Sequence, residues 1–189
     1  MANTEEQEFG ARWYRDARAY AEELSQEFSL NVEASAAVIA VMSPGTEWGL
    51  NKRDARRLIA DTLAGDFQAR YATYGQNVIK ARCIVELERQ GDAWGEYVRG
   101  PKVTAFWRNI VEPRGALGNV TVDFHAYSVA HGKRYTTKSV PAFGRLGYER
   151  IALAYRQVAK SVGLLPHELQ AVCWVCWKRL AKQGRRVAA

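Results

Sequence analysis

Cysteine and long apolar runs are both scarce in this chain of 189 residues. The three cysteines, Cys83, Cys173 and Cys176, are too few and too scattered for a disulfide framework. No apolar run approaches the roughly 20 residues that span a bilayer, and the start of the chain (MANTEEQEFG) is acidic, unlike a secretory signal. These absences predict an intracellular, cytoplasmic protein that does not enter a membrane.

Strand-type alternation, internal repeats and low-complexity tracts are missing as well, apart from the short stretch NVTV at 119–122. Helical spacing dominates instead and predicts one all-α domain of about seven to nine helices. The expected parts are an acidic N-terminal helix over 1–30, a core over 31–131 and C-terminal helices over 148–184. Asn31 is the predicted N-cap of an apolar helix that stops at Pro44-Gly45.

Two connections and one helix complete the expected layout. The segment 44–51 is predicted to be a loop before a basic-faced helix that opens at Lys52, and 132–147 is predicted to be an extended, basic loop. Another helix follows from Tyr74, with Ile79 and Ile84 in its inner apolar stripe.

The net charge of +7 is unevenly distributed. Residues 1–33 carry eight acidic and three basic side chains, so the remaining residues carry 12 acidic and 24 basic ones, a net charge of +12. A basic body suits a polyanion such as nucleic acid, although an excess of lysine and arginine also serves simple solubility.

Two short segments contain the candidate catalytic residues. In GPKVTAF, Lys102 follows Gly100-Pro101, and proline suits the first turn of a helix because its φ is fixed. In VTVDFHAYSVA, Asp123 follows a β-branched run at a predicted helix start, with His125 two places on. Each residue also has an ordinary interpretation, as a solvated lysine, a plain N-cap, and a packed or capping histidine.

Taken in order, the segments VIAVMSPGTEWGLNKRDARRLI, YGQNVIKARCIVELERQ, GPKVTAF and VTVDFHAYSVA resemble the helix-hairpin-helix DNA glycosylases, most closely the endonuclease III type. In that superfamily a hairpin L-P-G-x-G-x-K leads into a helix, and a V-D-T-H segment opens a later one. Lys102 and Gly100 match the lysine and the second glycine of the hairpin, and Asp123 and His125 match V-D-T-H. The resemblance implies an all-helical bundle of two lobes with a cleft between them.

The resemblance further implies a DNA N-glycosylase with abasic-site lyase activity, in which Lys102 is the nucleophile and Asp123 an electrostatic partner or proton shuttle. Breaking an N-glycosidic bond builds oxocarbenium character, which a nearby carboxylate stabilises. A neutral lysine amine then forms a Schiff base with the sugar. Neither a metal nor another cofactor is implied. The expected partner is double-stranded DNA with one base flipped out, and the protein is expected to be a monomer.

The chain departs from the family at three places. Glu96-Tyr97-Val98 replaces the start of the hairpin, so the first hairpin glycine and its close approach to a phosphate are missing. Phe124 replaces the threonine of V-D-T-H. Three cysteines cannot complete the four-cysteine iron–sulfur cluster that many members carry, and Cys173 and Cys176 are better interpreted as core residues.

The loop MSPGTEWGLNK stands where the family lines its base pocket. Trp48 is therefore predicted to stack on a flipped base, and Glu47 to accept from the base. In the alternative interpretation Trp48 covers the edge of the core and Asn51 caps the next helix. The candidate substrate contacts are Ser43, Thr46, Glu47, Trp48, Asn51, Phe124 and His125, and the candidate DNA contacts are Gly100, Lys52, Arg53, Arg56, Lys80, Arg82, Lys133, Arg134 and Lys138.

Two other functions stay open at the level of sequence. One is a phage-type enzyme that modifies a thymine-derived base in DNA instead of excising it. The other is a DNA-binding module that keeps the scaffold without turnover.

Overall fold

The computed structural model describes residues 2–115 and 118–183, and over these residues the chain is all-helical, as predicted. Met1 and Gly184, the ends of the two predicted terminal segments, lie outside the described residues. Within the described part the stretch 119–122 is extended but forms no strand. The elements are α1 (Thr4–Phe28), α2 (Val32–Met42), α3 (Trp48–Leu63), α4 (Gly75–Gln90), the short 3-10 helix η1 (Gly95–Tyr97), α5 (Pro101–Val111), α6 (Phe124–Ala130), α7 (Gly144–Val162) and α8 (Pro166–Lys182).

The chain divides into two compact units. The central unit comprises Ala17–Val111, and the terminal unit comprises Met1–Asp16 together with Glu112–Ala189. Helix α1 therefore contributes its first part to the terminal unit and its second part to the central unit. The resemblance implies two lobes within one domain, and whether the two units correspond to those lobes stays a prediction. The cleft stays a prediction.

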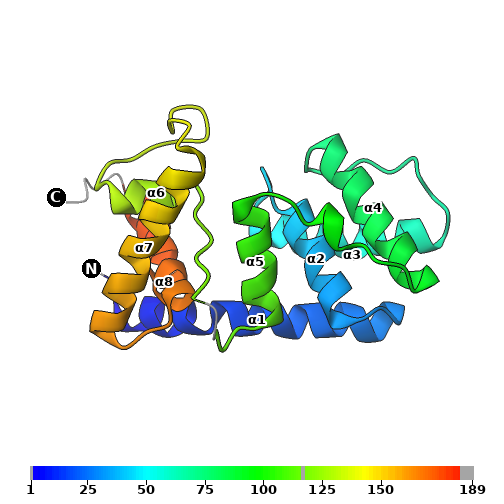
Figure 1. Ribbon diagram of the computed structural model, residues 1–189, viewed down its shortest axis with the longest axis horizontal. Coiled ribbons are helices and arrows are strands. Elements are labelled where there is room, and N and C mark those ends of the chain that lie inside the picture. The colour runs from blue at the N-terminus through cyan, green and yellow to red at the C-terminus, as the bar shows by residue number, and fades with distance from the viewer. Residues whose placement is uncertain (1, 116–117, 184–189) are drawn as a thin grey trace. The chain divides into compact units, whose positions relative to one another are not determined.

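Helix α2 forms the core of the central unit. It begins where predicted, because the Asn31 side chain accepts a hydrogen bond from Ala34 N at 2.6 Å. Every residue from Ala34 to Met42 is buried, and α3, α4 and α5 pack around this helix (Figure 1). A helix that is apolar on all sides is stable only when neighbours cover all of it, which is why the sequence places it at the centre.

The terminal unit is built from α6, α7 and α8, which pack on one another (Figure 1). Tyr148 of α7 links this packing to the extended stretch before α6: its hydroxyl donates to Val120 O at 2.7 Å and accepts from Val122 N at 3.1 Å. The first part of α1 adds Tyr14, whose hydroxyl lies 2.9 Å from Gln170 Oε1 of α8. The stretch 120–122 is therefore held in place by side chains of the helices around it.

Three expectations about helix positions are wrong. Helix α3 begins at Trp48 and not at Lys52, because Glu47 caps it with its carboxylate. Helix α7 begins at Gly144 and not at Tyr148, so the basic loop is shorter than predicted. Ile79 is 63% exposed, because α4 turns its neighbouring small and branched residues inward instead. For α3 the carboxylate of Glu47, which caps the helix, decided the outcome.

His167 of α8 is a buried histidine in the terminal unit and predicts a pH-dependent stability. It is 1% exposed, its Nε2 lies 2.9 Å from Pro113 O, and its Nδ1 has no partner among the described residues. Burial therefore lowers the pKa of His167 below its ordinary value. The unfolded chain then binds more protons than the folded one as the pH falls through about 6.5, so stability is full above that pH and is lost below it.

We expect the free energy of unfolding to fall between pH 7.5 and pH 5.5, with a slope of at most about 1.4 kcal/mol per pH unit from this group. His167→Gln keeps a donor toward Pro113 O but does not titrate, so its slope should be flatter in urea unfolding followed by tryptophan fluorescence. The matched control is His131→Gln, since His131 is exposed. Equal slopes in the wild type and in His167→Gln would contradict the assignment.

Candidate active site

Lys102 lies in the first turn of α5, as predicted. Pro101 is the first residue of that helix, and Gly100 has a φ of +90°, a left-handed conformation that favours glycine. Thr104 N donates to Gly100 O at 3.0 Å and closes the first turn. The side chain of Lys102 is half-buried. It therefore starts from the positive end of a helix, where a bound anion such as a phosphate is favoured.

The connection between α4 and α5 differs from the hairpin of the DNA glycosylases that the sequence resembles. Val98, which stands at the place of the first hairpin glycine, has a φ of −88° and is 8% exposed. Its side chain is part of the buried core. A phosphate therefore cannot approach the backbone amide at this position as closely as it could at a glycine. Of the predicted phosphate-binding hairpin, only Gly100 and the first turn of α5 are present.

Trp48 packs near the part of α5 that carries Lys102. Its ring contacts the ring of Phe106 edge to face, with centroids 6.4 Å apart. Phe106 follows Lys102 by one helical turn, so the two side chains share a face of α5. Lys52 Nζ lies 5.6 Å from the centre of the Trp48 ring and 5.3 Å from that of Tyr20. The central unit thus groups Lys52, Trp48 and Phe106 about one turn from Lys102.

The turn between α2 and α3 uses its polar side chains to cap helices. Ser43 Oγ donates to Ala40 O at 2.9 Å, and Thr46 Oγ1 donates to Met42 O at 3.2 Å, at the end of α2. Glu47 Oε2 accepts from two amides at the start of α3, at 3.0 and 3.4 Å. These bonds satisfy backbone groups that helix ends leave unpaired. Base contacts from Ser43, Thr46 and Glu47 stay predictions, and they would compete with the caps.

Asn51 lies inside α3, so the interpretation of this residue as a helix cap is wrong. Its side chain is 1% exposed, and its Nδ2 donates to Ile39 O of α2 at 3.1 Å. The Oδ1 atom is buried without a hydrogen-bond partner among the described residues. The amide therefore ties α3 to α2, and the predicted substrate contact now depends on Oδ1 alone.

Replacing Glu47 with alanine separates the cap from a base contact. We expect the free energy of unfolding to fall by about 1 kcal/mol, because two amides lose their acceptor. If the cap is its only role, DNA binding and base release stay at wild-type levels. Glu47→Asp keeps a carboxylate at the cap and should restore stability in urea unfolding. A loss of base release in both variants, beyond any loss of stability, would contradict the cap-only role.

Asp123 is the N-cap of α6, as predicted. Its Oδ1 accepts from Ala126 N at 2.8 Å, and its backbone is extended, with φ −107° and ψ −173°. The residue before it, Val122, is held by the Tyr148 hydroxyl. The carboxylate is half-buried, and Oδ2 has no hydrogen bond among the described residues. One oxygen therefore holds the helix start while the other is available for a substrate.

Phe124 and His125 follow directly and pack on each other, with ring centroids 3.9 Å apart. Both side chains are half-buried. The contact agrees with the packed interpretation of His125, and its role toward substrate stays a prediction. Lys102 belongs to the central unit and Asp123 to the terminal unit, so the candidate residues form two groups, one in each unit.

Several of the predicted DNA contacts already have partners within the protein. The Arg82 guanidinium lies 4.9 Å from the Phe67 ring centre, and its Nη1 donates to Phe67 O at 3.2 Å. Arg56 pairs with Glu27 at 2.8 Å. A phosphate would have to compete with these partners, which makes Arg82 and Arg56 weaker candidates than the sequence indicates.

The remaining basic candidates have weaker ties within the protein or are fully exposed. Arg53 is 73% exposed at its side chain and has a long contact of 3.5 Å to Asp54, and Lys80 is half-buried. Lys133, Arg134 and Lys138 are all exposed on the segment between α6 and α7. These residues suit contacts with phosphates, and the last three lie in the terminal unit beside the Asp123 helix.

Cys173 and Cys176 behave as core residues. Both thiols are free, Cys176 is buried, and burial raises the pKa of Cys173 to about 11. Among the described residues, no group of three or more histidine, cysteine, aspartate or glutamate side chains is placed to hold a metal ion. The CxxC pattern is therefore explained by packing.

Three exposed residues were missed at the level of sequence. Tyr74 is 66% exposed and lies against Gly45 in the turn before α3, and Leu146 is 78% exposed beside exposed Arg145. Tyr74 stands just before a helix and Leu146 just inside one. The exposure of such residues cannot be predicted from helical periodicity, because it depends on the surrounding fold. The composition of GKRYTTKSVPAFGRLG, basic with apolar residues interspersed, was the available hint.

A family model matches residues 1–181 of the chain. The chain belongs to the DUF7178 family. DUF7178 is described as a family of unknown function, so membership assigns no activity. The match spans both units, so the Lys102 turn and the Asp123 turn lie within one DUF7178 match. No curated protein and no solved structure matches the chain. Within the described residues, no helix is long and apolar enough to cross a membrane.

Proposed function

We propose that this chain is a DNA N-glycosylase with associated abasic-site lyase activity, acting on a damaged or modified base that is flipped out of duplex DNA. Lys102 is the nucleophile and Asp123 the carboxylate that stabilises charge on the sugar. The observation that supports this proposal most is the local setting of the two residues. Each stands at the start of a helix, with Lys102 behind a left-handed glycine and Asp123 as an N-cap with one oxygen to spare.

The chemistry follows from those settings. The Lys102 amine forms a bond to C1′ of the sugar, the bond from C1′ to the base nitrogen breaks, and the base leaves after taking up a proton. Positive charge develops on the sugar in this step, and the Asp123 carboxylate stabilises it. The first covalent product carries the lysine nitrogen on C1′ of the closed sugar. The nitrogen then loses a proton, the C1′–O4′ bond breaks as O4′ takes up a proton, and the opened sugar is joined to Lys102 as a Schiff base. Loss of a C2′ proton from it expels the 3′ phosphate and cleaves the strand.

Trp48 of the central unit is the proposed stacking partner of the flipped base. Its indole is half-buried and already packs against Phe106 and Lys52, so it is held in one orientation. An oriented aromatic ring is the kind of surface on which a flipped base stacks. Each unit also carries exposed basic side chains that suit contacts with phosphates, Arg53 in the central unit and Lys133, Arg134 and Lys138 in the terminal unit.

The test is borohydride trapping. Wild-type protein is incubated with duplex DNA that contains one abasic site, and sodium borohydride is added to reduce any Schiff base to a stable amine. A covalent protein–DNA band in a denaturing gel is the expected result. A panel of duplexes with damaged or modified bases is assayed in parallel for base release. If the wild type neither forms an adduct nor releases any base, the proposal fails.

The same assays separate the two alternatives. Change of a thymine-derived base without its release, on phage-type modified DNA, would identify a base-modifying enzyme. Phe124 in place of the family's threonine is the feature that fits this outcome, because it changes the surroundings of Asp123. Tight binding with a steep salt dependence, but no reaction on any duplex, would identify a non-catalytic DNA-binding module.

A further inference from the structure

We infer that the first turn of α7 is a wedge for duplex DNA, in which Leu146 enters the base stack while Lys138, Arg145 and Arg150 contact the phosphates. The inference rests on the proposed function in that it takes DNA as the partner. It adds a second DNA contact, in the terminal unit, that the resemblance does not supply.

Leu146 is the starting observation. It is 78% exposed, more than any other large apolar side chain among the described residues. It is the third residue of α7, so a helix and not a free loop presents it. An exposed leucine of this kind has no role in the core, and burying it against a partner would remove apolar surface from water.

The turn that carries Leu146 is fixed from both sides. The ring of Phe143, just before the helix, stacks on Tyr127 of α6 with centroids 5.0 Å apart. Gly147 allows this packing, because a Cβ there would lie 2.8 Å from Phe143 Cβ. On the other side, Tyr148 is buried and bonded to the stretch before Asp123. A rigidly held apolar side chain can be inserted between bases with little loss of conformational freedom.

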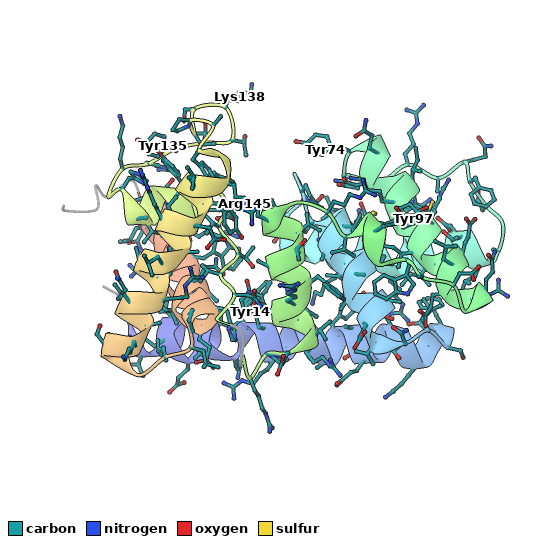
Figure 2. The ribbon with its side chains drawn as sticks, in the orientation of Figure 1. Tyr14, Tyr74, Tyr97, Tyr135, Lys138 and Arg145 are labelled. Atoms are coloured by element: carbon teal, nitrogen blue, oxygen red, sulfur yellow. The ribbon has the colours of Figure 1, made fainter. Side chains whose placement is uncertain are left out.

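The charge around Leu146 indicates a polyanion. The segment 131–150 holds five basic side chains against one carboxylate, that of Glu149, which pairs with Arg156 at 3.2 Å. Figure 2 shows Tyr135, Lys138 and Arg145 around the loop before α7 and at its start. Lys138, Arg145 and Arg150 are exposed, and none of the three pairs with a carboxylate among the described residues.

The location ties the wedge to the candidate site. Tyr148, two residues after Leu146, donates to Val120 O and accepts from Val122 N, and Val122 directly precedes Asp123. The anchor that fixes the wedge therefore also fixes the start of the Asp123 helix. Proteins that insert an apolar side chain between base steps unstack and kink the duplex, and unstacking lowers the cost of turning a base out.

A lipid surface fits these observations less well. Membrane-surface helices present a continuous apolar face. Helix α7 exposes Leu146, Leu153, Val158 and Val162, but the exposed charged side chains of Arg145, Glu149, Arg150 and Lys160 interrupt this set. In the first two turns Leu146 is the one exposed large apolar side chain, and its exposed neighbours Arg145, Glu149 and Arg150 are charged, which suits a narrow insertion between bases. Duplex DNA is therefore the partner that these side chains favour, and binding to lipid vesicles is the competing result.

The experiment compares Leu146→Ala with Leu153→Ala, which removes another exposed leucine from the same helix. The probe is a duplex that contains one tetrahydrofuran abasic-site analogue, which cannot form a Schiff base, with 2-aminopurine beside it. Fluorescence anisotropy gives Kd at several salt concentrations, and 2-aminopurine fluorescence reports unstacking. We expect Leu146→Ala to raise Kd about 10- to 100-fold and to abolish the rise in 2-aminopurine fluorescence.

The controls make the result specific. Leu153→Ala should bind like the wild type, and Leu146→Phe, which keeps a large apolar side chain, should retain unstacking. Arg145→Gln should reduce the slope of log K against log salt by about 0.9, whereas Leu146→Ala should leave that slope unchanged. Circular dichroism and thermal unfolding of each variant confirm that the fold is kept.

The wedge is refuted if Leu146→Ala keeps the wild-type Kd and unstacking, or if Leu146→Ala and Leu153→Ala lose DNA affinity equally. It is also refuted if the wild type binds vesicles of anionic lipid and Leu146→Ala loses that binding while its DNA binding is unaffected. Because the analogue cannot react, the wedge and the proposed chemistry fail separately. A wild type that unstacks the duplex but forms no borohydride adduct on a natural abasic site supports the wedge and refutes the lyase. A wild type that forms the adduct, together with a Leu146→Ala variant that binds and unstacks the duplex as well as the wild type, supports the lyase and refutes the wedge.

Discussion

Lys102→Ala is expected to lose the borohydride adduct with abasic DNA completely. The adduct requires an amine that reaches C1′, and alanine has none. Lys102 begins on the first turn of α5 behind Gly100, so its removal opens no cavity in the core and leaves the start of the helix intact. We therefore expect the free energy of unfolding to change by less than about 0.5 kcal/mol, as for an ordinary surface substitution.

Two further variants decide whether the loss is chemical or electrostatic. Lys102→Arg keeps the positive charge toward DNA but supplies no nucleophilic amine, so it should bind the abasic duplex and still form no adduct. Lys160→Ala removes an exposed lysine from the last turn of α7 and should trap like the wild type. An adduct that persists in Lys102→Ala would exclude this residue as the nucleophile. Peptide mapping of the trapped protein would then identify the amine that reacts.

Asp123→Asn is expected to reduce base release by about 10²- to 10³-fold, the usual effect of removing one electrostatic group that stabilises a transition state. The measurement is single-turnover base release on whichever modified duplex the wild type acts upon. Asparagine caps a helix about as well as aspartate, so the bond to Ala126 N is kept and stability changes little. The substitution thus removes the charge and leaves the cap.

Asp123→Ala provides the comparison. It removes both the charge and the cap, and we expect it to lose the same activity together with about 1 kcal/mol of stability. If Asp123 serves only as a cap, the pattern reverses: Asp123→Asn keeps full turnover, and Asp123→Ala loses stability without a matching loss of rate per folded molecule. Thermal unfolding and base release measured on the same preparations distinguish the two patterns.

The local features of the candidate site were predictable because they depend on neighbours in the sequence. Proline after glycine opens α5 with Lys102 in its first turn, and aspartate after a β-branched run caps α6. The apolar helix behind Asn31 was predictable for the same reason: its cap lies three residues from the amide it satisfies, and its composition demands burial. Contacts of this range need no knowledge of the fold.

Contacts from farther along the chain explain the errors. The sequence pattern places Asn51 in a loop or at a helix cap. In the structure its amide donates to Ile39 O on α2, and only the packing of α3 on α2 makes that bond possible. From the sequence, Arg82 is as good a candidate for a phosphate contact as the other basic residues. In the structure it lies on Phe67, because the segment after α3 folds back over α4. Neither outcome is encoded by residue type at those positions.

The sequence was sufficient for the helical class, for the caps at Asn31 and Asp123 and for the position of Lys102 in the first turn of its helix, because capping, helix spacing and the glycine–proline turn act over a few residues. Tertiary structure decided which side chains the helices expose. Leu146 is exposed because Phe143 packs on Tyr127 and Tyr148 bonds to Val120, partners on other elements of the terminal unit. The same leucine would be a core residue if that turn faced inward. Its position in the sequence does not show whether it is buried or exposed.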